Sequence, residues 1–199
     1  MEKKPFPNGL ADELFERGNI EMTSQEVRAV AISTMKVLPD SIVYDIGAGT
    51  GSVAIEAAYA ASEGKVYAVE CDPAAVTLLK RNCEKMNADN VVVIEGTAPE
   101  VLHDLPAADL VFIGGSDGSL EHIVDGVLEK NRGAKRDLRM VISLVAMKNI
   151  ASTVVMLSEK KALKIEYTQV TAGRLRTERE RSIIENSDPV FVIKADFKM

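Results

Sequence analysis

The sequence is poor in cysteine and has no long apolar segment. Cys71 and Cys83, its two cysteines, form no Cys-x-x-Cys pattern, and only His103 and His122 could join them as ligands. We therefore expect reduced thiols and no metal site. The longest apolar run, 140–147, is far shorter than the roughly 18 residues of a membrane-spanning helix. Because the first residues also lack the apolar core of a signal peptide, we expect a cytoplasmic protein without a membrane anchor.

Basic residues are also outnumbered by acidic ones. The 199 residues include 24 Lys and Arg against 30 Asp and Glu, which gives a net charge of −6. Binding to nucleic acid needs a basic face that neutralises phosphates, so this balance argues against a nucleic-acid partner. Basic clusters remain only locally, at 130–139 and 174–181.

The chain does have a regular alternation of short β-branched runs and longer amphipathic stretches. This order is typical of a parallel sheet wound by helices. It predicts strands at 42–46, 65–70, 91–95, 110–113, 138–145, 164–171 and 189–197, and helices at 52–61, 73–86, 119–130 and 148–160. A further helix is expected to begin at the capping box Thr23-Ser-Gln-Glu26, with the Thr23 hydroxyl as cap, and to stop before Pro39.

The last two predicted strands have no helical pattern between them, which suggests that the final strand inserts antiparallel. The fold class predicted is therefore α/β and Rossmann-like, with a seven-stranded, mostly parallel sheet and helices on both faces. One domain of residues 1–199 accounts for the chain, with an N-terminal segment at 1–38 and the core at 40–199. That length leaves no room for a separate substrate domain.

The most informative segment is a glycine loop between the first strand and its helix. Glycines permit positive φ and close approach of a ligand, and the helix start offers amides and a positive dipole end. A pyrophosphate fingerprint would read G-x-G-x-x-G, but here Ser52 stands where the last glycine belongs, which disfavours NAD. The compact form resembles the cofactor loop of class I S-adenosylmethionine-dependent methyltransferases. Its candidate binding residues are Asp45, Gly47, Ala48, Gly49, Thr50 and Gly51.

Further candidates follow at the ends of later strands. Glu70 ends the second strand, where a carboxylate can accept hydrogen bonds from both ribose hydroxyls of an adenosine group. Thr97 and Ala98 follow the third strand and could meet the adenine edge, and Gly114 follows the fourth. The alternative interpretation is that these positions are tight turns and solvated strand ends. Their combined order along the chain favours a cofactor site.

The sequence resembles the CbiT-type cobalt-precorrin methyltransferases of cobalamin biosynthesis. The resemblance is carried, in chain order, by 9–18, 22–28, 45–51, Glu70, Gly96 with Ala98, 113–116, Arg174-Leu-Arg176 and 188–190. It implies S-adenosylmethionine as methyl donor, a class I methyltransferase fold, and a cofactor set of Thr23, 47–51, Glu70 and Ala98. It also implies methylation of carbon 15 of cobalt-precorrin-6B with loss of carbon dioxide from the ring C acetate, giving cobalt-precorrin-7. A homotetramer, and a separate companion enzyme for carbon 5, are further expectations.

The substrate of such an enzyme carries several acetate and propionate groups. Arg174 and Arg176 share one side of an extended segment and are candidates for binding these carboxylates. The alternative is that 174–181, where basic and acidic residues are mixed, is simply a solvated charged run.

Two other functions remain open from the sequence. Another class I methyltransferase, acting on adenine N1 of tRNA or on protein isoaspartate, would share the N-terminal helix and a similar loop. A module that binds S-adenosylmethionine without catalysis, as a regulator or an inactive partner, would share the cofactor site. Turnover of the corrinoid or of tRNA discriminates between the enzymes, and absence of any turnover identifies the binding module.

Overall fold

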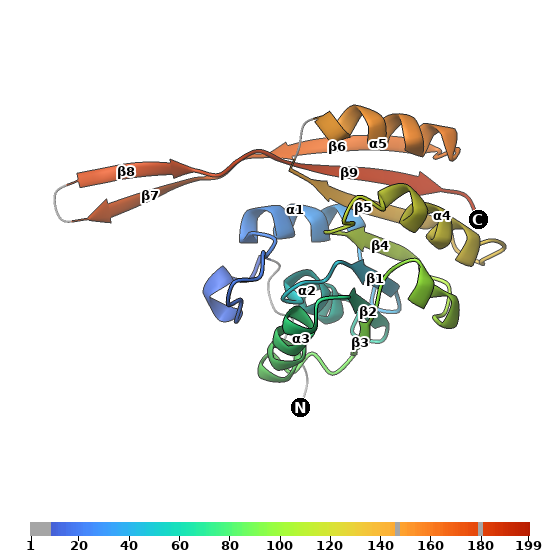
Figure 1. The fold of residues 1–199 in the computed structure, drawn as a ribbon, viewed down its shortest axis with the longest axis horizontal. Helices are drawn as coiled ribbons and strands as arrows, with labels where there is room; N and C mark the ends of the chain where they lie inside the picture. The colour runs from blue at the N-terminus through green and yellow to red at the C-terminus, as the bar shows by residue number, and fades with distance from the viewer. Residues whose placement is uncertain (1–8, 146–147, 179–180) are drawn as a thin grey trace.

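The computed structural model describes residues 9–145, 148–178 and 181–199. Its main sheet has seven strands in the order β3-β2-β1-β4-β5-β9-β6 (Figure 1). The strands are β1 (Ile42–Ile46), β2 (Lys65–Glu70), β3 (Val91–Glu95), β4 (Leu110–Ile113), β5 (Leu138–Leu144), β6 (Lys164–Val170) and β9 (Val190–Phe197). Strands β1 to β5 pair in parallel, and β9 lies antiparallel between β5 and β6. The predicted fold class and the antiparallel final strand are confirmed.

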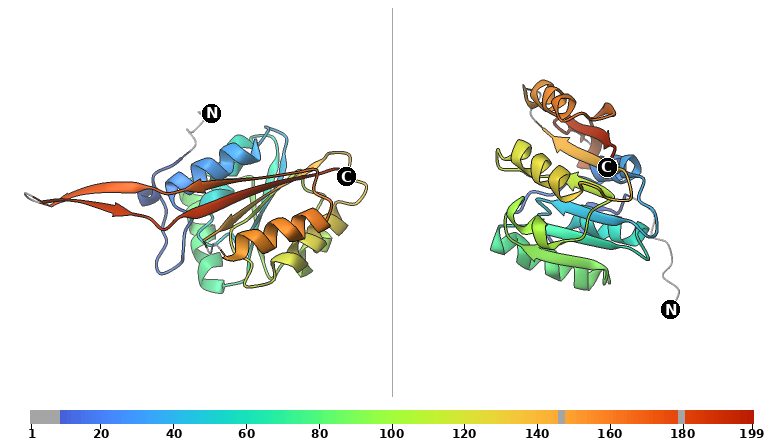
Figure 2. Two further views of the ribbon diagram at one scale, coloured as in Figure 1. Left: turned by 90° about the horizontal axis from the view of Figure 1, so that it is seen from above. Right: turned by 90° about the vertical axis from the view of Figure 1, so that its right-hand side faces the viewer.

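Helices cover both faces of this sheet (Figure 2). One face packs against α1 (Gln25–Met35), α2 (Ser52–Ala60) and α3 (Pro73–Lys85), and the other against η2 (Glu100–Asp104), α4 (Leu120–Lys130) and α5 (Lys148–Glu159). Successive strand residues face opposite sides, so Val43 joins the first cluster and Tyr44 the second, both fully buried. Burial on both faces explains why the central strand β4, Leu-Val-Phe-Ile, is a continuous apolar run. Among the described residues, no helix is long and apolar enough to cross a membrane.

The cap of the first helix differs from the sequence prediction. The N-cap residue of α1 is Ser24, not Thr23, and no side-chain hydrogen bond caps the helix. The Glu26 carboxylate accepts hydrogen bonds from Arg174 of the C-terminal part of the chain, at 2.9 and 3.1 Å. The predicted capping box was therefore wrong, because the helix begins one residue later than expected, which places Thr23 outside the cap and Glu26 outside the third helical position.

The N-terminal segment is held to the core by a buried arginine. Arg28 of α1 is fully buried and donates to Glu56 of α2 at 2.5 Å, to Asp12 at 3.1 Å and to the Thr23 carbonyl at 2.6 Å. Its guanidinium also lies over the Phe15 ring, 4.8 Å from the centroid. These contacts tie both ends of the stretch before α1 to the core. Residues 1–8 of the predicted segment lie outside the described residues.

A second, two-stranded sheet was not anticipated from the sequence. Strands β7 (Gly173–Glu178) and β8 (Arg181–Asn186) form an antiparallel hairpin, here called the arm, that extends away from the main sheet (Figure 1). The residues between them are Arg179-Glu180, not the Asn-Gly or Asp-Gly that signals a hairpin. Leu175 and Ile184 face each other across the arm and are 66% and 65% exposed.

Candidate active site

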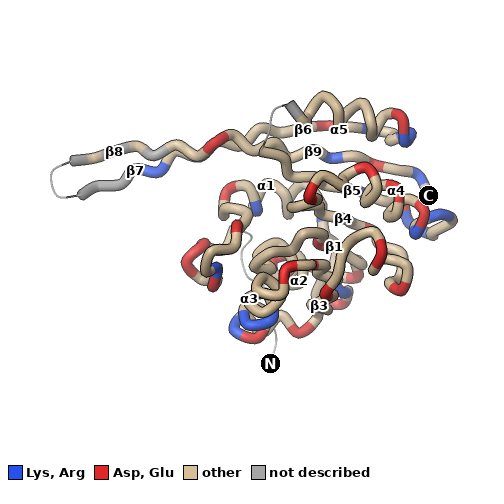
Figure 3. The backbone as a smooth tube through the Cα atoms, viewed as in Figure 1, with Lys and Arg blue, Asp and Glu red and all other residues tan. Residues whose placement is uncertain are grey.

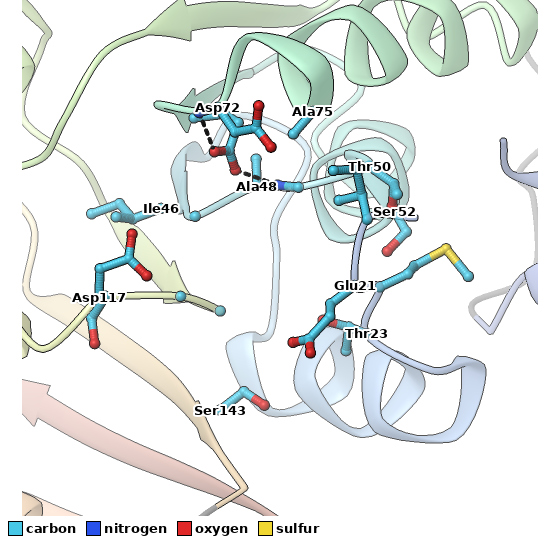
Figure 4. A pocket seen from close by; sticks show the side chains of 18 of the residues that line it. Glu21, Thr23, Ile46, Ala48, Thr50, Ser52, Asp72, Ala75, Asp117 and Ser143 are labelled. Atoms are coloured by element: carbon cyan, nitrogen blue, oxygen red, sulfur yellow. Dashed lines mark hydrogen bonds between the residues drawn. The ribbon is translucent and has the colours of Figure 1, made fainter. Parts of the chain in front are cut away.

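A cavity of about 700 Å³ opens at the carboxyl edge of the parallel strands, where ligands bind in doubly wound sheets. Its volume is in the range of small-molecule sites. The glycine loop after β1, the loops after β2, β3 and β4, and residues 19–24 of the N-terminal segment line it (Figure 4). The end of β5 and the start of β9 contribute from the other side. Segments from distant parts of the chain therefore converge on one site.

The glycine loop approaches its neighbours so closely that side chains would not fit. Gly47 has φ of 71°, and a Cβ there would lie 2.6 Å from the backbone of Gly115. Gly49 has φ of 54°, and its Cβ would lie 3.2 Å from the carbonyl oxygen of Glu21. These contacts place the loop directly against the loop after β4 and against the N-terminal segment. Glycine is thus required by both conformation and space.

Glu70 is fixed by backbone amides at the end of β2. Its Oε2 accepts from the Gly49 amide at 2.7 Å, and its Oε1 accepts from Cys71 and Asp72 at 2.8 and 2.9 Å. The side chain is 9% exposed and lines the cavity. Carboxylate oxygens have lone pairs beyond these bonds, so Glu70 can also accept from the two hydroxyls of a ribose.

Two buried polar groups beside the loop have no partner within the described chain. Thr50 Oγ1 is one, in a residue that is 1% exposed and lines the cavity. Asp45 Oδ2, behind the loop, is the other. Burial raises the pKa of the Asp45 carboxyl to about 7, and the negative charge of Glu70 adds to this, while the Ala54 amide opposes it. An unsatisfied hydroxyl in the cavity wall fits a polar ligand, and S-adenosylmethionine meets this test.

Most of the residues predicted from the sequence line the cavity. They are Thr23, Gly47, Ala48, Gly49, Thr50, Glu70, Thr97, Ala98 and Gly114. Asp45 and Gly51 are not among the lining residues. Asp45 is buried beneath the loop, and Gly51 packs on α3, where a Cβ would lie 2.1 Å from the Leu79 Cδ1. These two positions hold the loop in shape from behind.

Other lining residues escaped the sequence analysis. Glu21, Asp117, Ser143 and Asp188 all line the cavity. Ser143 could have been found, because it lies near the carboxyl end of a predicted parallel strand. Asp188 could also have been found, because an antiparallel strand begins where its parallel neighbours end. Glu21 had no signal, since it lies in an irregular segment positioned by the buried Arg28.

Of the two candidate substrate arginines, Arg174 is described with its side chain, and it is not among the cavity-lining residues. Arg174, in the arm, is 53% exposed and pairs with Glu26 at 2.9 Å and with Asp12 at 3.4 Å. It therefore links the arm to the N-terminal segment. Arg176 lies in β7, but its side chain is outside the described part of the structure.

Comparison with known proteins shows relatives that match this chain over nearly the whole of both sequences. Residues 13–181 match the family described as the precorrin methyltransferase domain. A protein of Salmonella typhimurium named cobalt-precorrin-6B C(15)-methyltransferase (decarboxylating) is 34% identical over 92% of this chain and 94% of its own. A protein of Pyrobaculum calidifontis, given the same name with the qualifier "probable", is 39% identical over 94% of this chain and 95% of its own.

A solved structure agrees with these relatives. The precorrin-6y C5,15-methyltransferase of Geobacter metallireducens superposes with a TM-score of 0.88 and 34% identity, covering 97% of this chain and 100% of that one. Both the sequence match and the fold extend across the glycine loop and the strand ends that form the cavity. This chain belongs to the precorrin methyltransferase family.

Proposed function

We propose that this protein methylates carbon 15 of cobalt-precorrin-6B with S-adenosylmethionine and removes the ring C acetate carboxyl as carbon dioxide. The product is cobalt-precorrin-7, an intermediate of cobalamin biosynthesis. One observation carries the proposal: in a chain of this family, the glycine loop, the amide-held Glu70 and residues 19–24 converge on one cavity. The relatives that match nearly the whole chain are named for this activity.

The cofactor would lie across the glycine loop. Glu70 would accept hydrogen bonds from the ribose hydroxyls, and Thr97 and Ala98 after β3 would contact the adenine edge. Thr23, Ala48, Thr50 and Gly114 would surround the methionine portion. The amides of 47–51 at the start of α2 would meet polar groups of the ligand, helped by the helix dipole. Asp45 and Gly51 would support this loop from behind.

S-adenosylmethionine, when bound, supplies a methyl group that its sulfonium has already activated. The residues of the chain would then mainly position the reacting carbon and exclude water. The described lining residues include no His, Lys or Arg. Loss of carbon dioxide breaks the bond between the acetate methylene and its carboxyl, and the electron pair enters the conjugated macrocycle.

The acetate and propionate carboxylates at the periphery of the macrocycle need basic side chains as partners, and the described cavity lining supplies none. Arg174 and Arg176 of the arm are proposed for this role. The contacts of Arg174 with Glu26 and Asp12 use Nε and Nη2. A guanidinium has five N–H donors, so Arg174 can hold the arm against the N-terminal segment and still bind a substrate carboxylate.

We also propose that the protein is a homotetramer. The arm extends from the body and exposes the apolar pair Leu175 and Ile184 (Figure 1). On β6, at one edge of the main sheet, Tyr167 is 63% exposed. Exposed apolar side chains on an extended hairpin and beside an open sheet edge suit contact with further copies of the chain.

A separate companion enzyme is proposed for carbon 5. The relatives from Salmonella typhimurium and Pyrobaculum calidifontis, which match nearly the whole chain, are named for carbon 15 alone. The present sequence contains one glycine loop of this kind and one acidic strand end paired with it. A single cofactor site serves one methylation at a time.

The cytoplasmic location expected from the sequence stays a prediction.

The test is to incubate the purified protein with cobalt-precorrin-6B and methyl-labelled S-adenosylmethionine and to follow product mass. The expected product gains one labelled methyl group and loses one carbon dioxide. The rival tRNA function requires a basic face, but the Lys and Arg positions of the described chain are scattered among acidic ones (Figure 3). Turnover of tRNA without turnover of the corrinoid would contradict the proposal.

A further inference from the structure

The charged side chains described in the cavity wall are all acidic. Five carboxylate side chains line it, and the described lining residues include no Lys, Arg or His. The carboxylates are Glu21, Glu70, Asp72, Asp117 and Asp188. Glu70 is occupied by three backbone amides, and Asp72 caps α3 through a hydrogen bond from the Ala74 amide at 2.8 Å. Two of the five are therefore held by the backbone.

The remaining three carboxylates come from separate segments. Glu21 belongs to the N-terminal segment, Asp117 to the loop after β4, and Asp188 to the residues before β9. Within the described residues, no hydrogen bond or ion pair engages their side chains. Glu21 and Asp117 approach the open centre of the cavity from opposite sides (Figure 4). Their negative charge is left for a ligand.

A second polar feature lies in the wall of the same cavity. The Thr50 hydroxyl is buried in the same wall and has no partner in the described chain. A buried hydroxyl without a partner costs free energy unless a ligand or ordered water supplies one. The cavity thus combines an unsatisfied polar group with uncompensated negative charge, which suits a cationic ligand.

We infer that this cavity distinguishes its ligands by charge, with Glu21 and Asp117 favouring the sulfonium of S-adenosylmethionine over the neutral thioether of S-adenosylhomocysteine. The inference rests on the proposed function. The ammonium and carboxylate of the methionine portion are common to both compounds, so the sulfonium is their only difference in charge. Transfer of the methyl group removes that charge, and the cavity then holds the product less tightly.

The solvent exposure of Glu21 and Asp117 limits how strongly the cavity can prefer S-adenosylmethionine to S-adenosylhomocysteine. Glu21 and Asp117 are exposed to the open cavity, so solvent and salt screen them, and each contributes a several-fold effect rather than a large one. The two carboxylates act together on one charge. Neutralising both is expected to weaken binding of S-adenosylmethionine by about 5–20-fold and that of S-adenosylhomocysteine by less than about 2-fold.

Calorimetric titration of the full chain tests this directly. The variants are Glu21→Gln and Glu21→Gln with Asp117→Asn, and the matched control is Glu13→Gln, an exposed glutamate of the same segment that does not line the cavity. The ligands are S-adenosylmethionine, S-adenosylhomocysteine, and sinefungin, in which a carbon that carries a protonated amine replaces the sulfonium sulfur and its methyl group. We expect sinefungin to follow S-adenosylmethionine, and the control to leave all three affinities unchanged.

The outcomes distinguish failure of the charge preference from failure of the cofactor site. Equal losses for all three ligands, or no loss for any, would overturn the charge preference while leaving the cofactor site intact. Failure of the wild-type chain to bind any of the three would contradict the proposed function and, with it, this inference. A preference for S-adenosylmethionine that shrinks with added salt supports the electrostatic origin.

Discussion

At the scale of single residues, the site depends on two carboxylates in contrasting environments. Asp45 is buried with an oxygen that no described group satisfies, whereas each oxygen of Glu70 accepts from backbone amides. Burial favours the neutral form of Asp45. The two carboxylates therefore differ in role, since Asp45 supports the loop from behind and Glu70 lines the cavity as the proposed ribose acceptor.

The raised pKa of Asp45 predicts a specific pH dependence of stability. In the folded protein this carboxyl keeps its proton up to about pH 7, while its ordinary pKa is 3.8. Folding therefore binds a proton between these values, and the stability that Asp45 contributes is full below about pH 4 and lost as pH rises through 7. Relative to wild type, Asp45→Asn is expected to gain about 2–4 kcal/mol in free energy of unfolding between pH 4 and 8. Urea denaturation at several pH values measures this, and parallel curves would show that Asp45 ionises normally.

Glu70 carries the second residue-scale prediction. Glu70→Ala is expected to weaken S-adenosylmethionine binding by about 10–100-fold, because two hydrogen bonds to a charged acceptor are lost. Glu95→Ala is the matched control, since Glu95 ends β3 beside Glu70 but does not line the cavity. Calorimetry gives both affinities, and circular dichroism checks that both variants remain folded. Equal affinity in the Glu70 variant would show that the ribose is bound elsewhere.

At the scale of elements, the N-terminal segment depends on Arg28. Its partner Glu56 is 2% exposed and also accepts from the Gly9 and Leu10 amides, both at 2.9 Å. The segment therefore lies across α2 through one buried charged network. Because residues 19–24 continue from this network into the cavity wall, the network also determines where Glu21 and Thr23 lie.

Removing the arginine should therefore affect both stability and binding. Arg28→Met leaves Glu56 buried without its counterion, and the free energy of unfolding is expected to fall by about 3–5 kcal/mol. Adding Glu56→Gln to that variant should recover part of the loss. Chemical denaturation measures both, and calorimetry should show weaker S-adenosylmethionine binding in Arg28→Met. A loss below about 1 kcal/mol would mean that packing, not the charge network, holds the segment.

At the scale of the whole molecule, the arm is the part that the core leaves uncovered. It leaves the main sheet where β6 and β9 end their pairing, at Val170 and Val190. In the described chain its clearest contact with the body is the pairing of Arg174 with Glu26 and Asp12. A two-stranded hairpin that leaves its apolar residues exposed has little stability of its own. Contacts with other copies of the chain would bury these residues and stabilise it.

Assembly provides the corresponding prediction. Wild-type protein should sediment as a tetramer of the 21.6 kDa chain, and Leu175→Asp with Ile184→Asp should shift it to smaller species. Val155→Asp, at an exposed position of α5 away from the arm, is the control and should leave the tetramer intact. Analytical ultracentrifugation distinguishes these states. A monomeric wild type would contradict the homotetramer, and a tetrameric arm variant would contradict the role of the arm.

Much of the fold follows from local pattern. The strand and helix positions could be predicted from apolar periodicity, because burial on one or both faces restricts which residues each position tolerates. The prediction for α3 was nearly complete, since Pro73 and the Asp72 cap are local signals. The arm was missed because Arg179-Glu180 carries no turn signal. The Thr23 cap was wrong because the neighbouring Ser24 is an equally good cap residue by type, and the helix begins after it.

The sequence by itself determined the sheet, the glycine loop and the acid at the end of β2, because each depends on neighbours in the chain. Only the tertiary structure decided that Glu21, Asp117 and Asp188 would line one cavity with Glu70 and without a cation among the described lining residues. These carboxylates lie in irregular segments whose positions are set by long-range contacts, above all by the buried Arg28 and the antiparallel entry of β9. The arrangement of charges around the cavity depends on which distant segments come into contact. Contacts between irregular segments produce no periodic pattern in the sequence, so they could not be predicted from it.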